Sequence, residues 1–377
     1  MFNHQNQSKD RYMLTGYNRK LGYDWWWHSL TARNAKTGEE KPFFIEFFLC
    51  NPSLGGKYPI LGQDPQNQLL GRKPSYLMVK AGTWGKDHVQ LHRFFGWDDV
   101  LVKRGAHYHI EAEDCFASEK LLRGSIKVSH EDAMEHPEYM CDEGEMSFEL
   151  VLDKEVAFNV GYGTRPILRR AEAFEMYWHA EGMKTKYAGN IYLNGEKYIV
   201  DPESSYGYAD KNWGRGFTSP WIWLSSNHIV SRLDNRELKN TVFDIGGGQP
   251  KVYQFSIPSQ LLTAMYYEGR EFEFNFSKFW LGTRTRFAAR ETKDEVIWRV
   301  WQKSIQGEMK TEIHCKKEDM LLVNYEAPDG SKRHNRLWNG GNGWGRVQLF
   351  EYRNRKKVLV DDMDVYNVGC EYGKYDS

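Results

Sequence analysis

The chain has 377 residues, more than one ordinary hydrophobic core usually holds, and this length predicts two structural units. Its 51 basic and 51 acidic side chains cancel, so the composition argues against a nucleic acid or an anionic membrane as the main partner. The 20 Phe, 22 Tyr and 14 Trp residues are a heavy aromatic load, which suits the walls of an apolar cavity.

The cysteines and the N-terminal segment predict a cytoplasmic protein. The five cysteines are odd in number, widely spaced and without a C-x-x-C pair, as expected for reduced thiols. Residues 1–13 lack the apolar stretch of a secretion signal, and no window approaches the ~18 apolar residues of a membrane span. We therefore expect no integral membrane association, so that a lipidic substrate meets the protein from the aqueous side.

Period-two alternation of apolar and polar residues dominates the first half of the chain and predicts an antiparallel sheet. The expected strands cover residues 43–49, 76–80, 106–113, 120–128, 146–152, 189–193 and 197–200. Asn194 and Gly195 tolerate positive φ angles and are expected to join the last two strands as a hairpin. The acidic, aperiodic stretch from Ser129 to Glu145 predicts an exposed loop or, alternatively, a lid over a pocket.

The stretch from Tyr208 to Ile229 places polar groups beside a wall of indole. It begins with a charged and amide cluster next to a Trp, turns through a Gly-Arg-Gly sequence, and continues as an aromatic strand. Because side chains alternate along a strand, Trp221, Trp223 and Asn227 are expected on the same face.

The second half of the chain repeats the pattern of short strands. They are expected at residues 221–229, 241–245, 251–257, 271–276, 279–288, 295–303, 308–316, 320–325, 345–352 and 357–365. One helical turn is predicted at residues 259–267, and residues 328–330 and 339–343 have the composition of hairpin turns.

Two aromatic strands, at residues 25–27 and 221–223, each open one set of strands and predict two related β units. We place these units at residues 1–214 and 215–377. Barrels or strongly bent sandwiches close the edges of such sheets and leave an interior that holds a ligand.

Several motifs, in this order along the chain, resemble the tocopherol cyclase family. They are YDWWWHSL (23–30), PFFIEFFLCNP (42–52), DKNWG (210–214), WIWLSSN (221–227), IGGGQPKV (245–252), YYEGREFEF (266–274), and QLFEY, LVDDMDV and VGCEYG between residues 348 and 373. The resemblance covers most of the chain and implies an all-β fold of two consecutive lipocalin-like antiparallel barrel or sandwich units with an aromatic-lined pocket.

One departure from the family pattern concerns the first aromatic strand. Tyr23 and Asp24 stand where the family has Glu-Gly, and His28 stands where it has a Lys. This difference leaves open whether the substrate is the prenylated quinol of the family.

The family reaction adds a phenol hydroxyl across a prenyl alkene and requires an acid that protonates carbon. A carboxyl buried among aromatic rings stays protonated near neutral pH, and the rings stabilise the resulting cation and exclude water. No metal and no redox cofactor is required, so we expect no cofactor.

Four residues are the candidates for catalysis. Asp210 occupies the acidic position of the family-like motif, although an ion pair that pins the turn between the units is the alternative. Glu371 matches the Glu of the last family motif, with a surface position as the alternative. Lys211 would hold a phenolate or enolate oxygen unless it is solvated, and His179 is either a base or proton relay or a core histidine.

The remaining candidates bind substrate. Asn212 and Asn227 either orient a substrate oxygen or cap backbone groups. Glu46 interrupts an apolar strand and must be paired or point outward. The full set of substrate-binding candidates is Asn212, Trp213, Trp221, Trp223, Asn227, Trp27, Asp24 and Glu46.

A His-x-His pattern is a weak metal candidate. His107, His109, Glu111 and Glu113 share one face of the expected strand, as metal ligands would, but a solvent-facing strand has the same pattern. Gly246–Gly248 lacks the Lys-Ser/Thr of a phosphate loop, and no G-x-S-x-G elbow is present.

The sequence thus predicts a cofactor-independent enzyme that protonates an alkene in a small hydrophobic or aromatic substrate and leads to cyclisation, hydration or isomerisation. One alternative is a non-catalytic carrier of a lipophilic or aromatic ligand. The other is an enzyme acting on a sugar-like polar substrate stacked on Trp. The sequence leaves the oligomeric state open.

Overall fold

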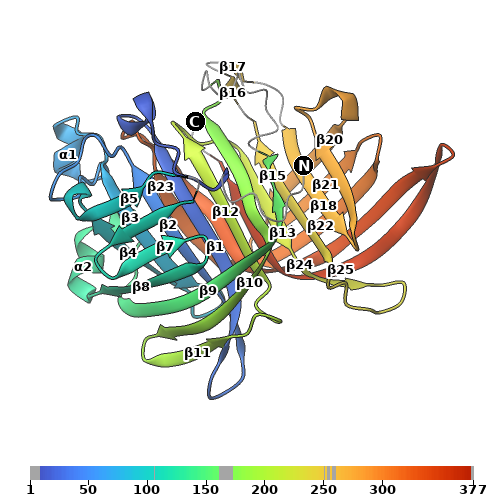
Figure 1. Ribbon diagram of the computed structural model, residues 1–377, viewed down its shortest axis with the longest axis horizontal. Coiled ribbons are helices and arrows are strands. Elements are labelled where there is room, and N and C mark those ends of the chain that lie inside the picture. The colour runs from blue at the N-terminus through green and yellow to red at the C-terminus, as the bar shows by residue number, and fades with distance from the viewer. Residues whose placement is uncertain are drawn as a thin grey trace.

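The computed structural model describes residues 9–105, 107–160, 173–249, 251–252, 255–256 and 260–374. They form two strongly curved antiparallel sheets that stand side by side, the first from the N-terminal half of the chain and the second from the C-terminal half (Figure 1). The fold is all-β, a barrel followed by a half-barrel of lipocalin-like type, and this confirms the fold class expected from the sequence.

The first sheet has twelve strands, with the order β4-β3-β2-β1-β11-β10-β9-β8-β7-β6-β5 and with β12 paired to both β1 and β10. It curls until β4 packs against β8 and β9, which closes the barrel. Its strands are β1 (Tyr23–Asn34), β2 (Glu40–Cys50), β3 (Tyr76–Thr83), β4 (Val89–Phe95), β5 (Val100–Lys103), β6 (His109–Ala112), β7 (Cys115–Ser118), β8 (Leu121–Val128), β9 (Gly144–Phe158), β10 (Met176–Leu193), β11 (Glu196–Val200) and β12 (Gly207–Gly214).

The second sheet has eleven strands, with the order β19-β18-β15-β13-β25-β24-β22-β21-β20, while β14 pairs with β25 and β23 with β24. Its strands are β13 (Trp221–Ser226), β14 (His228–Ser231), β15 (Thr241–Gly248), β18 (Gln260–Tyr267), β19 (Arg270–Asn275), β20 (Arg284–Glu291), β21 (Glu295–Lys303), β22 (Gly307–Lys316), β23 (Met320–Glu326), β24 (Lys332–Arg353) and β25 (Lys356–Gly373). The short strands β16 (Lys251–Val252) and β17 (Phe255–Ser256) pair only with each other.

Two short α-helices lie beside the barrel. The first, α1 (Pro65–Leu69), begins after Asp64, whose carboxylate accepts two backbone N–H groups. The second, α2 (His130–Glu135), begins with a capping box formed by Ser129. No helix among the described residues is long and apolar enough to cross a membrane.

Side-chain alternation divides the core into three apolar clusters. Trp26 points into the barrel, whereas Trp25 and Trp27 point out of it, toward the second sheet. In the same way Leu224 points into the half-barrel, and Trp223 points toward the first sheet. We call the side chains between the two sheets the inter-barrel layer; its buried aromatic members include Trp25, Trp27, Phe44, Phe48, Trp84, Trp178, Tyr208, Trp221, Trp223 and Tyr325.

Most expected strands are present, and β21 has the predicted bounds. The Asn194-Gly195 hairpin is confirmed, with φ angles of 49° and 81°. The chain passes from the first sheet to the second between Gly214, the last residue of β12, and Trp221, the first of β13.

The expected helical turn at residues 259–267 is wrong, because residues 260–267 form β18 between β15 and β19. Hydrogen bonding to a strand on each side outweighs the local preference of a short segment. Part of the strand expected at 251–257 lies outside the described residues.

The Gly-rich segment at residues 339–343 is not a hairpin turn but lies inside β24, where the pairing with β25 shifts register. Its glycines permit close packing: a Cβ at Gly341 would lie 2.3 Å from the ring of Trp84. The segment from Ser129 to Glu145 is also not wholly exposed, since it contains α2 and the buried Tyr139.

Candidate functional site

Four polar or aromatic side chains form one row across the first sheet and face the inter-barrel layer. Lys80 in β3 lies opposite Glu46 in β2, Glu46 lies opposite Trp27 in β1, and Trp27 lies opposite Asp210 in β12. Side chains of directly opposed residues in adjacent strands point to the same face, so the register alone aligns them.

The second sheet contributes a matching row. Gly246 in β15 lies opposite Trp223 in β13, which lies opposite Glu371 in β25, and Glu371 lies opposite Asn339 in β24. The two rows bring the buried carboxyls of Glu46 and Asp210 and the half-buried carboxyl of Glu371 into one layer, although they are more than 150 residues apart along the chain.

Asp210 has the environment of a neutral acid. Its Oδ2 accepts hydrogen bonds from the indole of Trp178 at 2.8 Å and from the hydroxyl of Tyr208 at 3.1 Å, and its Oδ1 has no hydrogen-bond partner among the described residues. Burial raises the pKa of Asp210 to about 8 although both hydrogen bonds lower it, and Glu371 raises it further. No described cation pairs with Asp210, which does not form the ion pair considered as the alternative.

Glu371 has a different environment. Its Oε2 accepts the indole N–H of Trp221 at 2.6 Å, and its Oε1 accepts the amide of Asn339 at 2.6 Å. Burial raises its pKa to about 7, against these two hydrogen bonds. Because both oxygens already accept N–H groups, the geometry suits a carboxylate better than an acid.

The third carboxyl of the layer, Glu46, is paired. It lies 3.2 Å from the ammonium of Lys80, and both side chains are fully buried. Burial raises the pKa of Glu46, and Lys80 and Tyr325 lower it. Lys80 also sits 4.1 Å from the ring centroid of Tyr325, a cation–π contact inside the layer.

A cavity of about 80 Å³ lies beside the indoles that bind two of these carboxyls. Its walls include Trp178 and Trp221, the two indoles whose N–H groups bind Asp210 and Glu371, together with Gly246. A Cβ on Gly246 would lie 2.9 Å from the ring of Trp178, so the glycine allows the indole to occupy its place. The cavity is smaller than the ~300–1,000 Å³ typical of ligand pockets and has room for one end of a substrate.

The structure does not bring Asp24, Lys211 and His179 to this layer. Lys211 is opposite Trp26 and His179 across the β1-β12-β10 ladder, so its side chain points into the barrel, where it forms a buried ion pair with Asp24. Lys211 also lies 3.8 Å from the ring centroid of Trp26. Lys211 was predicted beside Asp210 because the two are adjacent in sequence, but neighbouring residues of a strand face opposite sides.

A second buried ionic cluster lies inside the barrel. The ammonium of Lys154 contacts Asp10 at 3.0 Å, Glu119 at 2.8 Å and Glu181 at 2.5 Å, and His179 contacts Asp10 at 2.9 Å. Burial alone would lower the pKa of Lys154, but the surrounding carboxyls raise it well above its ordinary value. His179 is thus a core histidine held by a carboxylate.

The other substrate-binding candidates fall into two groups. Asn212 lies opposite Trp25 and faces the inter-barrel layer, as does Trp27, whose indole N–H has no hydrogen-bond partner among the described residues. Trp213 instead stacks on Tyr177 at 5.3 Å, and Asn227 donates to the backbone carbonyls of Met183 and Gly207, which is a structural role.

The weak metal candidates do not form a site on one strand face. His107 precedes β6 and is exposed, and Glu113 has φ +52° in the turn after β6, where its carboxylate pairs with Arg93. His109 lies 3.2 Å from Glu111 and packs its ring edge-on against Phe116. Among the described residues no three His, Cys, Asp or Glu side chains are grouped as metal ligands.

Sequence reasoning missed several residues of the layer, namely Lys80, Trp178, Tyr208, Asp244 and Asn339. Tyr208 begins the singled-out stretch and shares a face with Asp210 two residues later, so period two alone indicated it. Asp244 precedes the Gly-rich motif on a strand that is otherwise apolar, VFDI, which was the available signal for a buried carboxyl.

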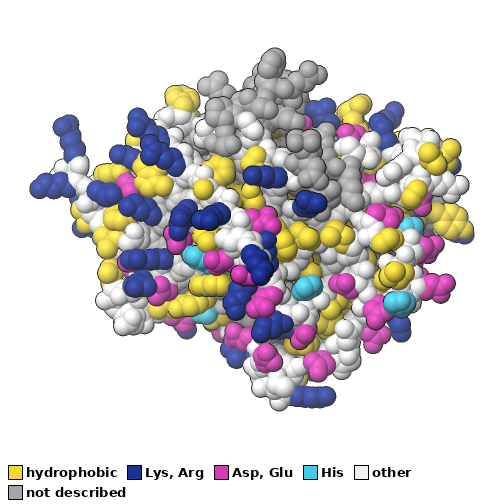
Figure 2. Space-filling view, turned by 180° about the vertical axis from the view of Figure 1, so that it is seen from behind, with side chains coloured by type: hydrophobic (Ala, Val, Ile, Leu, Met, Phe, Trp, Pro, Cys, Tyr) yellow, Lys and Arg dark blue, Asp and Glu magenta, His cyan; other side chains and the backbone are white. Residues whose placement is uncertain are grey.

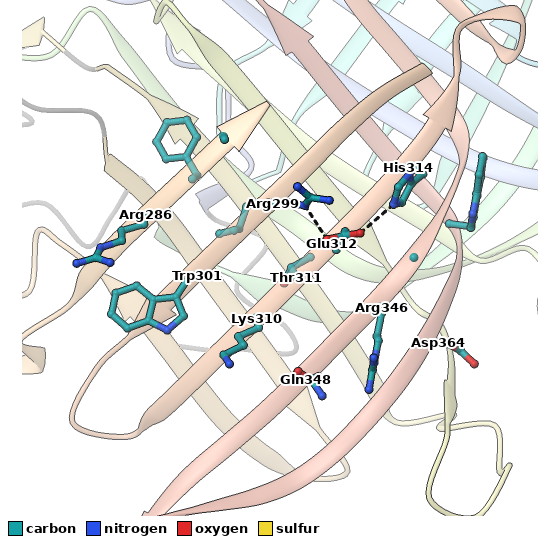
Figure 3. A pocket seen from close by; sticks show the side chains of 15 residues that line it. Arg286, Arg299, Trp301, Lys310, Thr311, Glu312, His314, Arg346, Gln348 and Asp364 are labelled. Atoms are coloured by element: carbon teal, nitrogen blue, oxygen red, sulfur yellow. Dashed lines mark hydrogen bonds and ion pairs between the residues drawn. The ribbon is translucent and has the colours of Figure 1, made fainter. Parts of the chain in front are cut away.

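An open hollow of about 850 Å³ lies elsewhere, over β20, β21, β22, β24 and β25. Figure 3 shows that Arg299 and His314 both contact Glu312 there, while Arg286 and Lys310 stand beside Trp301. Figure 2 shows charged side chains of both signs on the surface, with Lys and Arg gathered on one side of the view. This open, solvated surface lacks the buried carboxyls and enclosing indoles of the inter-barrel layer.

Buried carboxyls with raised pKa values make a testable contribution to stability. Glu326 accepts hydrogen bonds from Tyr76 and Tyr139, and burial raises its pKa to about 7. A carboxyl whose pKa is higher in the folded state than in the unfolded state stabilises the fold fully below its ordinary pKa. That stabilisation is lost as the pH rises toward the pKa of the folded state. We therefore expect Glu326→Gln to reduce the loss of stability between pH 5 and 7 by about 1.4 kcal/mol per pH unit.

Chemical denaturation at pH 5, 6 and 7 measures this slope, and Glu131→Gln, at an exposed position in α2, is the control. Parallel pH dependence in Glu326→Gln and the wild type would contradict a raised pKa at Glu326.

Sequence comparison shows similarity to one kind of enzyme. The chain is 31% identical over 144 residues to a protein described as "Tocopherol cyclase, chloroplastic" from Zea mays. The match covers 37% of this chain and 26% of that protein, so the chain aligns with about a quarter of the length of this curated relative. The match confirms the resemblance that the motifs indicate. No protein-family model matches the sequence.

Two solved structures are similar over nearly the whole chain. Kievitone hydratase from Nectria haematococca is 10% identical with a TM-score of 0.49, covering 99% of this chain and 93% of that one. CghA is 12% identical with a TM-score of 0.48, covering 95% of this chain and 90% of that one. At these identities the similarity concerns the arrangement of strands and not the chemistry.

Proposed function

We propose that this protein is a cofactor-independent enzyme of the tocopherol cyclase type, which protonates an alkene of a hydrophobic or aromatic substrate in the inter-barrel layer. The observation that carries the proposal is the carboxyl of Asp210, which is buried among indoles, has a pKa of about 8 and has one oxygen without a hydrogen-bond partner in the described part of the chain. Such a group keeps its proton at neutral pH and has an open position from which to donate it.

In the proposed reaction Asp210 transfers its proton to one alkene carbon and leaves a tertiary cation on the other. Trp178 and Tyr208 stabilise the carboxylate that remains, because both donate to its Oδ2. A substrate hydroxyl or a water then bonds to the cation and loses a proton, which returns to Asp210. The products are a cyclic ether or a hydrated alkene, and loss of a carbon-bound proton instead gives an isomer.

Glu371 has the complementary role in the proposal. As a carboxylate beside Trp221 it stabilises the cation, and the indole faces of the layer add cation–π attraction. The two carboxyls thus differ in role, because Asp210 has one oxygen without a donor among the described residues whereas both oxygens of Glu371 accept N–H groups.

The two roles predict how turnover depends on pH. The acid form of Asp210 is present below its pKa of about 8, so turnover is lost as pH rises through that value. The carboxylate of Glu371 is present above its pKa of about 7, so turnover is also lost as pH falls below 7. We expect a bell-shaped profile with its maximum between about 7 and 8.

The test incubates the purified protein in D₂O with prenylated phenols, carotenoid-like polyenes and oligosaccharides, with native mass spectrometry for binding and product analysis for deuterium. Deuterium on a carbon of a prenyl product supports the proposal. Binding of prenyl compounds without deuterium uptake makes the protein a carrier, and binding of oligosaccharides alone assigns it a polar substrate.

A further inference from the structure

One tyrosine hydroxyl joins two buried carboxyls in the inter-barrel layer. The hydroxyl oxygen of Tyr208 lies 3.1 Å from Oδ2 of Asp210 and 3.2 Å from Oδ2 of Asp244. Asp210 belongs to the first sheet and Asp244 to β15 of the second, and both are buried. The contact therefore links the two sheets at the proposed acid.

The number of available protons restricts the protonation states of Tyr208, Asp210 and Asp244. The Trp223 indole donates to the Tyr208 oxygen at 3.2 Å and to Oδ1 of Asp244 at 3.1 Å, and an indole nitrogen only donates. The Tyr208 hydroxyl carries one proton, which serves one of its two carboxyl contacts. The other contact is a hydrogen bond only if that carboxyl itself carries a proton.

The remaining contacts decide which carboxyl carries it. Oδ2 of Asp210 already accepts the indole of Trp178, so this oxygen is suited to accept from Tyr208 as well. Oδ2 of Asp244 contacts Tyr208 and its Oδ1 accepts from Trp223, and the backbone N–H of Ile245 also hydrogen-bonds to this carboxyl. Both contacts of the Tyr208 hydroxyl are hydrogen bonds when Asp244 donates to Tyr208 and Tyr208 donates to Asp210.

We infer that Asp244 is a positioning residue, which remains in its acid form and, through Tyr208, keeps the reactive proton of Asp210 on Oδ1. Both donors are directed at Oδ2, so a proton on Asp210 belongs on Oδ1, which has no partner among the residues that the structure describes. When that proton is transferred, the negative charge that develops on the carboxylate is stabilised by the two hydrogen bonds that Oδ2 already accepts. The inference deepens the proposed function and rests on it for its catalytic meaning.

The electrostatic surroundings agree with a neutral Asp244. Burial raises its pKa well above the ordinary value, and Asp210 raises it further, against hydrogen bonds from Tyr208 and Trp223. Other charged groups at the layer, among the described residues, are Glu46 and Lys80, which are paired with each other, Glu371, and Glu326, which binds Tyr76.

The test measures the titration of Asp210 itself and needs no substrate. Protein labelled with ¹³C at the aspartate carboxyl carbon is titrated by NMR between pH 6 and 10, and Asp210→Asn identifies the Asp210 signal. Asp244→Asn replaces a neutral donor with a neutral amide donor of the same shape, so we expect the Asp210 midpoint to stay within about half a pH unit of the wild type.

A fall of the Asp210 midpoint by more than about half a unit in Asp244→Asn overturns the inference, because it shows that an anionic Asp244 had been raising the pKa of Asp210. Tyr208→Phe supplies an independent arm. It removes one donor to the Asp210 carboxylate, so the midpoint is expected to rise by about one unit, and the alkaline limb of any turnover profile should rise with it.

An unchanged Asp210 midpoint in Tyr208→Phe also overturns the inference, since Tyr208 would then not donate to Asp210. Thermal unfolding establishes that each variant is folded before titration. If no substrate in the panel is converted, the proposed function fails, but the titrations still decide whether Asp244 and Tyr208 place the proton.

Discussion

Asp210→Asn is expected to reduce turnover by about 10²- to 10⁴-fold while substrate affinity changes by less than about threefold. The asparagine has the same shape, and its carbonyl oxygen accepts from Trp178 and Tyr208 as Oδ2 does. It lacks only the transferable proton. Initial rates of product formation and native mass spectrometry of the same preparations measure the two quantities.

The matched control is Glu326→Gln. Glu326 is also buried with a pKa raised to about 7, but its partners are Tyr76, Tyr139 and the backbone of Gly62, none of which belongs to the Asp210 row. Turnover in this variant should equal that of the wild type. Retention of more than a tenth of the turnover by Asp210→Asn would show that another group is the acid.

Lys154→Met is expected to destabilise the fold by about 3–5 kcal/mol, because the lysine is the cation that balances three buried carboxyls inside the barrel. Burial alone would raise the pKa of Asp10, but Lys154 and His179 hold it at about 2, so Asp10 is charged at neutral pH. Removing the lysine leaves that charge buried without its main partner. Urea denaturation at pH 7 measures the change.

A surface pair provides the control for this prediction. Lys120 lies 2.8 Å from Asp153, but these side chains are 60% and 68% exposed, so Lys120→Met should change stability by less than about 0.5 kcal/mol. Adding Asp10→Asn to Lys154→Met should recover part of the loss, since the uncompensated charge is then absent. Equal effects of Lys154→Met and Lys120→Met would show that the buried cluster is not an ionic one.

Local pattern determined most of the fold. Period two in segments such as residues 295–303 predicted strands with accurate bounds, since alternation is a property of consecutive residues. The same rule explains why Trp26 faces the barrel interior while Trp25 and Trp27 face the inter-barrel layer. It failed at residues 260–267 and 339–343, where pairing with neighbouring strands decided the conformation.

The site was predictable only in part. The motif resemblance indicated Asp210, Glu371 and the Trp221–Trp223 strand, and the structure places all of these in the inter-barrel layer. Proximity in the sequence wrongly grouped Lys211 with Asp210, although their side chains leave β12 on opposite faces. Lys80 and Asn339 carried no signal of their own, because a lysine or an asparagine in a strand is usually solvated.

The sequence by itself therefore determined most of the strands and the alternation of side chains between their two faces. It also placed aromatic residues and carboxyl groups in the same motifs. Only the tertiary structure decided which faces meet, because register joins Lys80 to Asp210 across four strands and packing then sets that row against Glu371 and Asp244. The protonation state of Asp210 follows from this packing of the two sheets. A carboxyl holds its proton at neutral pH when two sheets exclude water from it, and residues distant in sequence provide that exclusion.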